Sequence, residues 1–186
     1  AWQSRRAYPL VVTQGDGNLG VKGKNFEMLF SIAGAGPASL KVNGTEWLWR
    51  APRPAFWRAS TDNDRGCGFP LRAAAWMAAD VFVTYNGMKV LEAGPDCVKV
   101  QFQFGIPTVP GASAELVYTV EAQGALQVDA VYHGVAGAPE LPCFGVKFET
   151  FGPVTRTVWT GLSGETNPDH YKGRMLGSQK DTHQAD

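Results

Sequence analysis

The sequence predicts an all-β protein built as an antiparallel sandwich. Apolar and polar residues alternate with period two in several segments, as in strands that bury one face. The 186 residues include 22 glycines, and Asn-Gly and Asp-Gly pairs fall between the alternating segments. Helical patterns do not alternate with these strands, which argues against a parallel α/β sheet.

The predicted strands follow one another through most of the chain. Residues 40–42 and 45–47 flank Asn43-Gly44 and predict a hairpin. Asp16-Gly17 and Asn86-Gly87 are further pairs that favour the positive φ angles of tight turns. The other strands, given by the apolar residues expected to face inward, are Phe26, Met28, Phe30 and Ile32; Val98, Val100, Phe102 and Phe104; Leu116, Tyr118 and Val120; Leu126, Val128, Ala130 and Tyr132; and Val146 with Phe148.

One segment predicts a helix. Residues 71–80 are rich in alanine, Pro70 fits a first helical position, and one face would carry Leu71, Ala74, Ala75 and Ala78. The remaining organisation is simple: residues 1–176 are expected to form part of one sandwich domain, and residues 177–186 a polar C-terminal tail.

Charge and cysteine content exclude several classes of function. Lysine plus arginine equals aspartate plus glutamate at 17 each, and the absence of a basic run argues against binding to nucleic acid or an anionic membrane. No apolar stretch is long enough to span a membrane. Cys67, Cys97 and Cys143 are widely spaced, so we expect buried free thiols in a reduced, cytoplasmic compartment.

Charged side chains are densest in residues 52–66, which contain three arginines, two carboxylates, an amide and two aromatic residues. Such a segment favours an ordered loop in which guanidinium groups pair with carboxylates or carbonyls. We expect Arg53, Trp57 and Arg58 to have structural roles there. A calcium loop is not predicted, because Gly66 and Ala73 occupy positions where the ion needs oxygen ligands.

No catalytic residue or metal site is predicted. The carboxylates in motif-like settings are Asp62, Asp64, Glu165 and Asp169, and nothing in their spacing shows that any two face each other across a cleft, as glycoside hydrolysis requires. The histidines, His133, His170 and His183, lack the spacing of metal ligands.

Two stretches resemble the small-chain region of family 2 bacterial β-galactosidases. Gly23-Lys24-Asn25-Phe26 matches the family's G-x-N-F, and residues 52–66 match P-R-P-N-F-W-R-A-P-T-D-N-D-x-G, with Ala55 in place of asparagine and Ser60 in place of the second proline. A third stretch, residues 161–170, partly matches G-x-G-P-x-E-N-Y-x-D-R but lacks its tyrosine and arginine. The resemblance covers most of residues 20–175.

The resemblance implies a galactose mutarotase-like super-sandwich, of which this chain would be the first part. It implies that the catalytic glutamates lie on a TIM barrel outside this segment. The segment would need no cofactor of its own, and the parent enzyme could use divalent or monovalent cations. The segment would pack beside the barrel or large subunit and help to close the sugar-binding site. The residues it places near the mouth of that site are Asp62, Asn63, Asp64, Gly66 and Gly68.

The leading hypothesis is therefore an accessory domain of a β-galactosidase acting on terminal β-D-galactosides such as lactose, inactive by itself. Three alternatives stay open: an independent carbohydrate-binding module, a module for subunit assembly, and an aldose-1-epimerase-like enzyme using His133 or His170 beside Glu165 or Asp169. If the second half of the sandwich is missing, an edge or an apolar face would lack cover. The chain would then pair with a copy of itself, need its parent, or curl into a smaller closed sandwich, and we favour association. That face would carry Val98, Val100, Phe102, Tyr118 and Val128.

Overall fold

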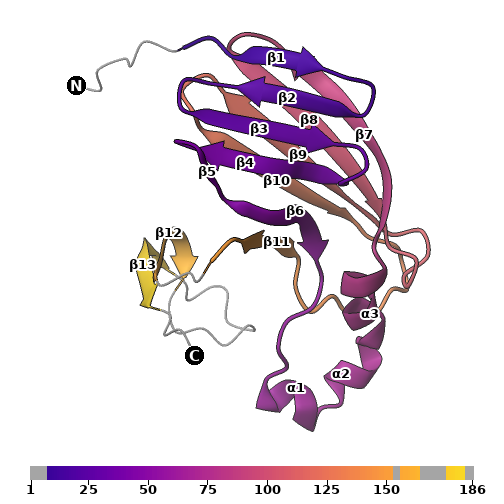
Figure 1. Cartoon of the computed structure of the whole chain (residues 1–186). Coiled ribbons are helices and arrows are strands. Elements are labelled where there is room, and N and C mark those ends of the chain that lie inside the picture. The colour runs from indigo at the N-terminus through magenta and orange to yellow at the C-terminus, as the bar shows by residue number, and fades with distance from the viewer. Residues whose placement is uncertain (1–7, 153–155, 164–174, 183–186) are drawn as a thin grey trace. The chain divides into compact units, whose positions relative to one another are not determined.

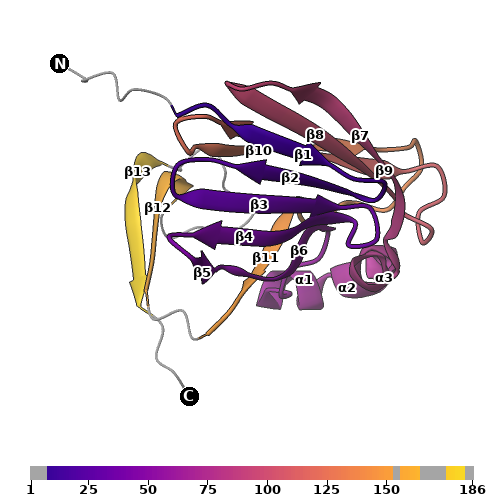
Figure 2. The same ribbon diagram turned by 45° about the horizontal axis from the view of Figure 1, so that its top comes forward.

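The computed structural model describes residues 8–152, 156–163 and 175–182. The chain divides into two compact units, residues 1–149 and 150–186, and each is treated by itself. The first unit holds two antiparallel sheets that lie face to face (Figures 1 and 2). The predicted all-β sandwich is confirmed.

The first sheet has five strands that pair in chain order: β1 (Val11–Gln14), β2 (Asn18–Lys22), β3 (Phe26–Ser31), β4 (Gly36–Val42) and β5 (Thr45–Glu46). The second has four strands in the order β10-β9-β8-β7, with β7 (Thr84–Ala93), β8 (Cys97–Gly105), β9 (Ser113–Glu121) and β10 (Leu126–His133). A two-stranded sheet joins β6 (Leu48–Ala55) to β11 (Gly145–Thr150).

The core lies between the two large sheets. Phe30 of β3 reaches across to the second sheet, where its ring centroid is 6.1 Å from that of Phe102 and 5.8 Å from that of Tyr118. Burying one such large apolar side chain contributes about 1.5–3 kcal/mol. The fully buried residues alternate along their strands as the period-two pattern predicts: Leu19, Val21, Phe30, Val98, Val100, Phe102, Leu116 and Tyr118.

The apolar face of these strands is covered, so the smaller closed sandwich is the outcome that the described residues show. Val98, Val100, Phe102 and Tyr118 are each 0% exposed, and Val128 is half-buried. The first sheet supplies the cover, because β2 and β3 turn their apolar residues toward the second sheet. The inward alternation fails only at two predicted positions: Ile32, which lies beyond the end of β3, and Phe148 are both exposed.

The predicted turns have three different outcomes. Asn43 (φ 50°) and Gly44 (φ 81°) form the two-residue hairpin between β4 and β5, as predicted. Asp16-Gly17 lies between β1 and β2, but neither residue has a positive φ. Asn86-Gly87 is not a turn: it lies inside β7, where Gly87 (φ 151°) sits at a bulge in the pairing with β8.

The described part of the chain has three short helices, not one: α1 (Asp62–Gly66), α2 (Phe69–Arg72) and α3 (Ala74–Phe82). The four residues expected near one face of the helix differ in burial, since Ala75 and Ala78 are half-buried. Leu71 and Ala74 are exposed, and Trp76 and Ala79 are the buried residues of α3. Because α3 is apolar on both sides, the alanine-rich pattern alone does not identify its inner face.

An aromatic cluster anchors α3 to the end of the sandwich. The ring of Trp76 lies 5.7 Å from Phe56, which follows β6, and 5.7 Å from Tyr132 of β10. Phe144, just before β11, stacks on Phe56 at 5.8 Å. Trp76 Nε1 donates a hydrogen bond to the carbonyl of Pro139 at 3.0 Å, which satisfies the buried indole.

The described residues of the second unit form an antiparallel pair, β12 (Arg156–Ser163) and β13 (Met175–Thr182). Residues 177–182, expected to lie in a polar tail, therefore belong to a strand. The cysteines also differ from expectation. All three are free, but Cys67 is exposed and Cys97 and Cys143 are half-buried, so none is a buried thiol. None of the described helices is long and apolar enough to cross a membrane.

Candidate functional site

The motif at residues 61–66 is a helix, where the sequence predicted an ordered loop. Thr61 precedes α1 and the backbone N–H of Asp64 donates to Thr61 Oγ1 at 3.2 Å. In return the N–H of Thr61 donates to Asp64 Oδ2 at 2.7 Å. This reciprocal capping box satisfies donors that the first turn leaves open, so it starts the helix at Asp62.

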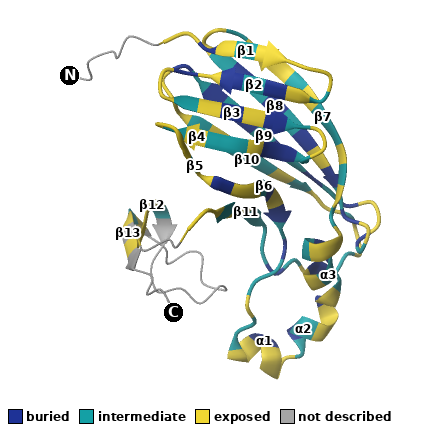
Figure 3. Cartoon of the chain, in the orientation of Figure 1, coloured by how far each residue is buried: buried dark blue, intermediate teal, exposed yellow. Residues whose placement is uncertain are grey.

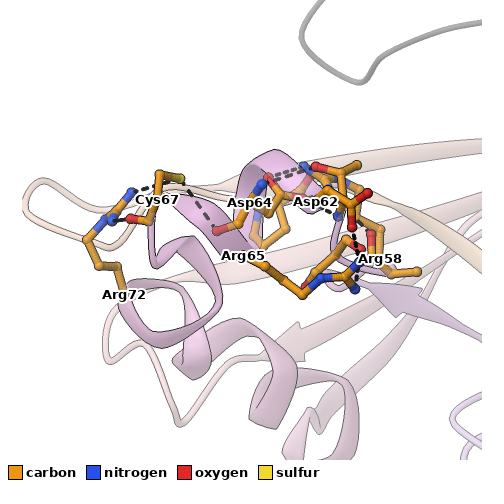
Figure 4. A network of polar contacts seen from close by, with 10 residues as sticks. Arg58, Asp62, Asp64, Arg65, Cys67 and Arg72 are labelled. Atoms are coloured by element: carbon orange, nitrogen blue, oxygen red, sulfur yellow. Dashed lines mark hydrogen bonds and ion pairs between the residues drawn. The ribbon is translucent and has the colours of Figure 1, made fainter.

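Arg58 binds the same carboxylate from the preceding segment (Figure 4). Its Nη1 lies 2.5 Å from Asp64 Oδ2 and its Nη2 3.3 Å from Oδ1, which is a two-point contact. Arg58 also donates from Nε to the carbonyl of Pro142 at 3.2 Å, and its guanidinium lies 6.0 Å from the centre of the Phe69 ring. One arginine thus connects α1, α2 and the segment that precedes β11.

Electrostatics keep Asp64 ionised. The hydrogen bond from Arg58, followed by that from the Thr61 backbone, holds the pKa of the Asp64 carboxyl well below its usual range. A general acid in glycoside hydrolysis needs the opposite shift, toward a raised pKa. Asp64 is therefore suited to holding α1 in place, and unsuited to donating a proton.

The other predicted site residues lie on the outer side of this network. Asp62, whose side chain is 94% exposed, pairs with Arg65 of the same helix. Asn63 and Gly66 are exposed, and Gly68 adopts the left-handed conformation (φ 70°) that links α1 to α2. The helix therefore directs Asp64 inward and presents Asp62 and Asn63 to solvent.

Two of the expected structural residues lie apart from the Arg58 network. Arg53 is exposed on β6, beside a cavity of about 110 Å³ that Asp80 and Glu149 also line. Trp57 is half-buried against the core. Arg58 is the member of the predicted trio that binds Asp64.

Sequence reasoning missed two polar residues that order this region. Asp80 Oδ1 accepts a hydrogen bond from the backbone N–H of Phe56 at 2.6 Å and so ties α3 to the end of β6. Arg72 of α2 donates to the carbonyl of Cys67, which closes the connection after α1. Asp80 could have been suspected, because it is the one polar residue in α3.

The acid–base pairing considered for a mutarotase-like enzyme is only partly described. His133 lies 3.4 Å from Glu115 Oε1, and Gln101 donates to the other oxygen of Glu115 at 2.7 Å. Glu165, Asp169 and His170 lie outside the described residues, as does most of the 161–170 motif. Within the described ranges, no group of three or more histidine, cysteine, aspartate or glutamate residues could hold a metal ion.

Comparisons with known proteins agree on one family. Residues 22–185 match the family described as β-galactosidase small chain. Over 93% of its length the chain is 41% identical to a protein of Latilactobacillus sakei named "Beta-galactosidase small subunit", of which it covers 60%. It is 35% identical to a β-galactosidase of Clostridium acetobutylicum, in a match that covers 92% of this chain and 19% of that protein. It is 37% identical to a β-galactosidase of Lactobacillus delbrueckii subsp. bulgaricus, in a match that covers 87% of this chain and 16% of that protein.

Proposed function

The chain belongs to the β-galactosidase small chain family, and from this we propose that it is an accessory part of a β-galactosidase that helps to complete the sugar-binding site. The enzyme would hydrolyse terminal β-D-galactosides with retention of configuration. The catalytic carboxylates would come from the rest of the enzyme, and this segment alone would be inactive.

The fixed position of α1 is the observation that supports this role. Arg58 and the Thr61 backbone use both oxygens of Asp64, so the helix is anchored by a residue that points inward. The exposed Asp62 and Asn63 are then held at defined positions without contributing to the anchor. A site that must contact a sugar benefits from polar groups that are positioned before the ligand arrives.

Asp62, Asn63, Gly66 and Gly68 are the residues we assign to the mouth of the sugar site. Asn63 can both donate and accept hydrogen bonds, as recognition of sugar hydroxyls requires. Asp64 holds α1, which carries Asp62 and Asn63, through its contacts with Arg58 and Thr61. We assign no cofactor to this segment, and any cation that the enzyme uses would be bound by other parts of it.

The relatives indicate how such a segment operates. One is named as a separate small subunit, whereas in others the matched segment makes up less than a fifth of a single chain. Both arrangements keep the segment together with a larger β-galactosidase polypeptide. We propose that this chain likewise functions only with that partner, in the cytoplasm.

A reconstitution assay tests the proposal. The chain alone is expected to leave a chromogenic β-galactoside intact, and to restore turnover when mixed with the large subunit that accompanies the Latilactobacillus sakei small subunit. Asn63→Ala should lower kcat/KM of the mixture about tenfold with Tm unchanged, a loss of about 1.4 kcal/mol in transition-state binding. Asn25→Ala, in the exposed turn between β2 and β3, is the matched control.

Other outcomes would contradict the proposal. Equal kcat/KM for Asn63→Ala and Asn25→Ala would remove Asn63 from the sugar site. Hydrolysis by the purified chain alone would contradict an accessory role. Tight galactoside binding by the chain without its partner would favour an independent carbohydrate-binding module.

A further inference from the structure

Helix α3 has two apolar sides, and only one of them is used within the described part of the chain. Trp76 and Ala79 face inward, and Asp80, its one polar residue, binds the backbone of Phe56. At 3.6 residues per turn, Ala74, Met77, Ala78, Val81 and Phe82 share the opposite side. We call these five residues the outer stripe of α3.

Ala74, Met77, Val81 and Phe82 of the outer stripe are exposed to solvent, and Ala78 is half-buried (Figure 3). Met77 is 54% exposed, Val81 71% and Phe82 61%, and Leu71 on the preceding helix is 85% exposed. None of these residues is charged. A helix that is apolar all round is typical of a buried position, and contiguous exposed apolar side chains mark interaction sites.

We propose that the outer stripe of α3 is the surface on which the larger catalytic β-galactosidase polypeptide docks. This inference rests on the proposed function and assigns its contact surface. The spacing i, i+3, i+4, i+7, i+8 suits a helix that lies in an apolar groove of its partner. The partner would therefore offer an uncharged groove, because an unpaired charge facing the stripe would be desolvated without compensation.

Continuity with the candidate sugar site favours this occupant over a second copy of the chain. Helix α1 leads to α3 through α2, and Arg72 and Arg58 fix the connections between them. A partner seated on α3 would therefore contact the same run of three connected helices that carries Asn63. In the relatives that join both parts in one chain, more than four-fifths of the polypeptide lies outside the matched segment and can supply the groove.

The test compares charge insertion on the stripe with charge insertion elsewhere. In Val81→Lys/Phe82→Lys the new cations lie at the C-terminal end of α3, where the helix dipole favours them, so folding should be preserved. Val11→Lys on β1 is the control, since Val11 is 57% exposed and lies on the sandwich. Binding to the Latilactobacillus sakei large subunit is measured by biolayer interferometry, and restored hydrolysis by titration of each variant.

The double variant should raise Kd about 100-fold, leave Tm unchanged and reach the wild-type rate at saturation, whereas Val11→Lys should bind like wild type. Wild-type Kd for the double variant, with activity still restored, would overturn this inference and leave the proposed function standing. Failure of the wild-type chain both to bind and to restore hydrolysis would overturn the two together.

Two further outcomes would assign the stripe another occupant and so overturn the inference. A wild-type dimer that the double variant converts to a monomer, measured by light scattering across a dilution series, would mean that the stripe binds a second copy. A clear fall in Tm for the double variant alone would mean that the chain itself covers the stripe.

Discussion

Arg58 and Asp64 form a two-point ion pair, with Nη1 to Oδ2 at 2.5 Å and Nη2 to Oδ1 at 3.3 Å. The same carboxylate accepts the N–H of Thr61. One aspartate therefore serves as ion-pair partner and as helix cap, and both roles depend on its negative charge. Removing that charge would take the carboxylate away from the half-buried side chain of Arg58.

Asp64→Asn should lower Tm clearly. Asparagine keeps the shape of the side chain, but it is neutral and replaces one acceptor oxygen with a donor that faces Arg58 or Thr61. Asp62→Asn removes the same charge from a side chain that is 94% exposed and should leave Tm nearly unchanged. Differential scanning fluorimetry of both variants checks this, and equal Tm values would show that the Arg58 network does not stabilise the fold.

The contribution of Asp64 should depend on pH in one direction. The pKa of its carboxyl is lower in the folded state than the value of about 3.9 for an unfolded chain. A lowered pKa means that the folded state binds the proton less readily, so the stabilisation is fully present above about pH 5 and is lost as pH falls further. The Tm difference between wild type and Asp64→Asn should therefore be constant from pH 7 to about pH 5 and shrink below pH 4. A difference that grows on acidification would contradict the assignment.

The sequence was sufficient for the parts of the fold that follow simple periodicity. The alternation in β8 and β9 identified Val98, Phe102 and Tyr118 as inward-facing, and Asn43-Gly44 identified a hairpin. In these segments one local rule determines the outcome, since side chains on a strand must alternate and a two-residue turn requires positive φ.

The errors arose where two local signals competed. The dense charges of residues 52–66 predicted an ion-paired loop, yet Thr61 and Asp64 have the three-residue spacing of a capping box, which starts α1. Asn86-Gly87 predicted a turn, but β7 pairs with β8 on both sides of these residues, so they form a bulge within the strand. The orientation of Asp64 could not be predicted either. Its partner Arg58 also binds the carbonyl of Pro142, which lies far along the chain.

Tyr118→Phe should raise the stability of the chain. The hydroxyl of Tyr118 is buried between the sheets and has no hydrogen-bond partner among the described residues. Burial also raises its pKa, as expected for a group without compensating polar contacts. Removing an unsatisfied buried hydroxyl should stabilise the fold by about 1 kcal/mol, measured by urea unfolding. Tyr8→Phe, at an exposed position, is the control; a loss of stability in Tyr118→Phe alone would mean that the hydroxyl has a partner.

The ring of Phe26 occupies the space that a side chain at position 23 would need, within the motif Gly23-Lys24-Asn25-Phe26. A Cβ atom at position 23 would lie under 3.0 Å from three carbons of the Phe26 ring. The ring is half-buried, packs against the core, and its edge lies near Gly124. Gly23→Ala should therefore cost about 1–3 kcal/mol, the usual range for overpacking. Gly17→Ala, where nothing lies within 4 Å, should cost much less.

A double-mutant cycle identifies the cause of that cost. If the Phe26 ring is the obstacle, Phe26→Ala removes it, and adding Gly23→Ala to that variant should change the free energy of unfolding by less than about 0.5 kcal/mol. If the cost instead reflects a backbone preference of Gly23, it would persist in the Phe26→Ala background, because the missing ring does not alter the conformations open to residue 23. Urea unfolding of the four proteins of the cycle separates the two causes. A persistent cost would show that the glycine of this motif is required by the backbone and not by the aromatic ring three residues later.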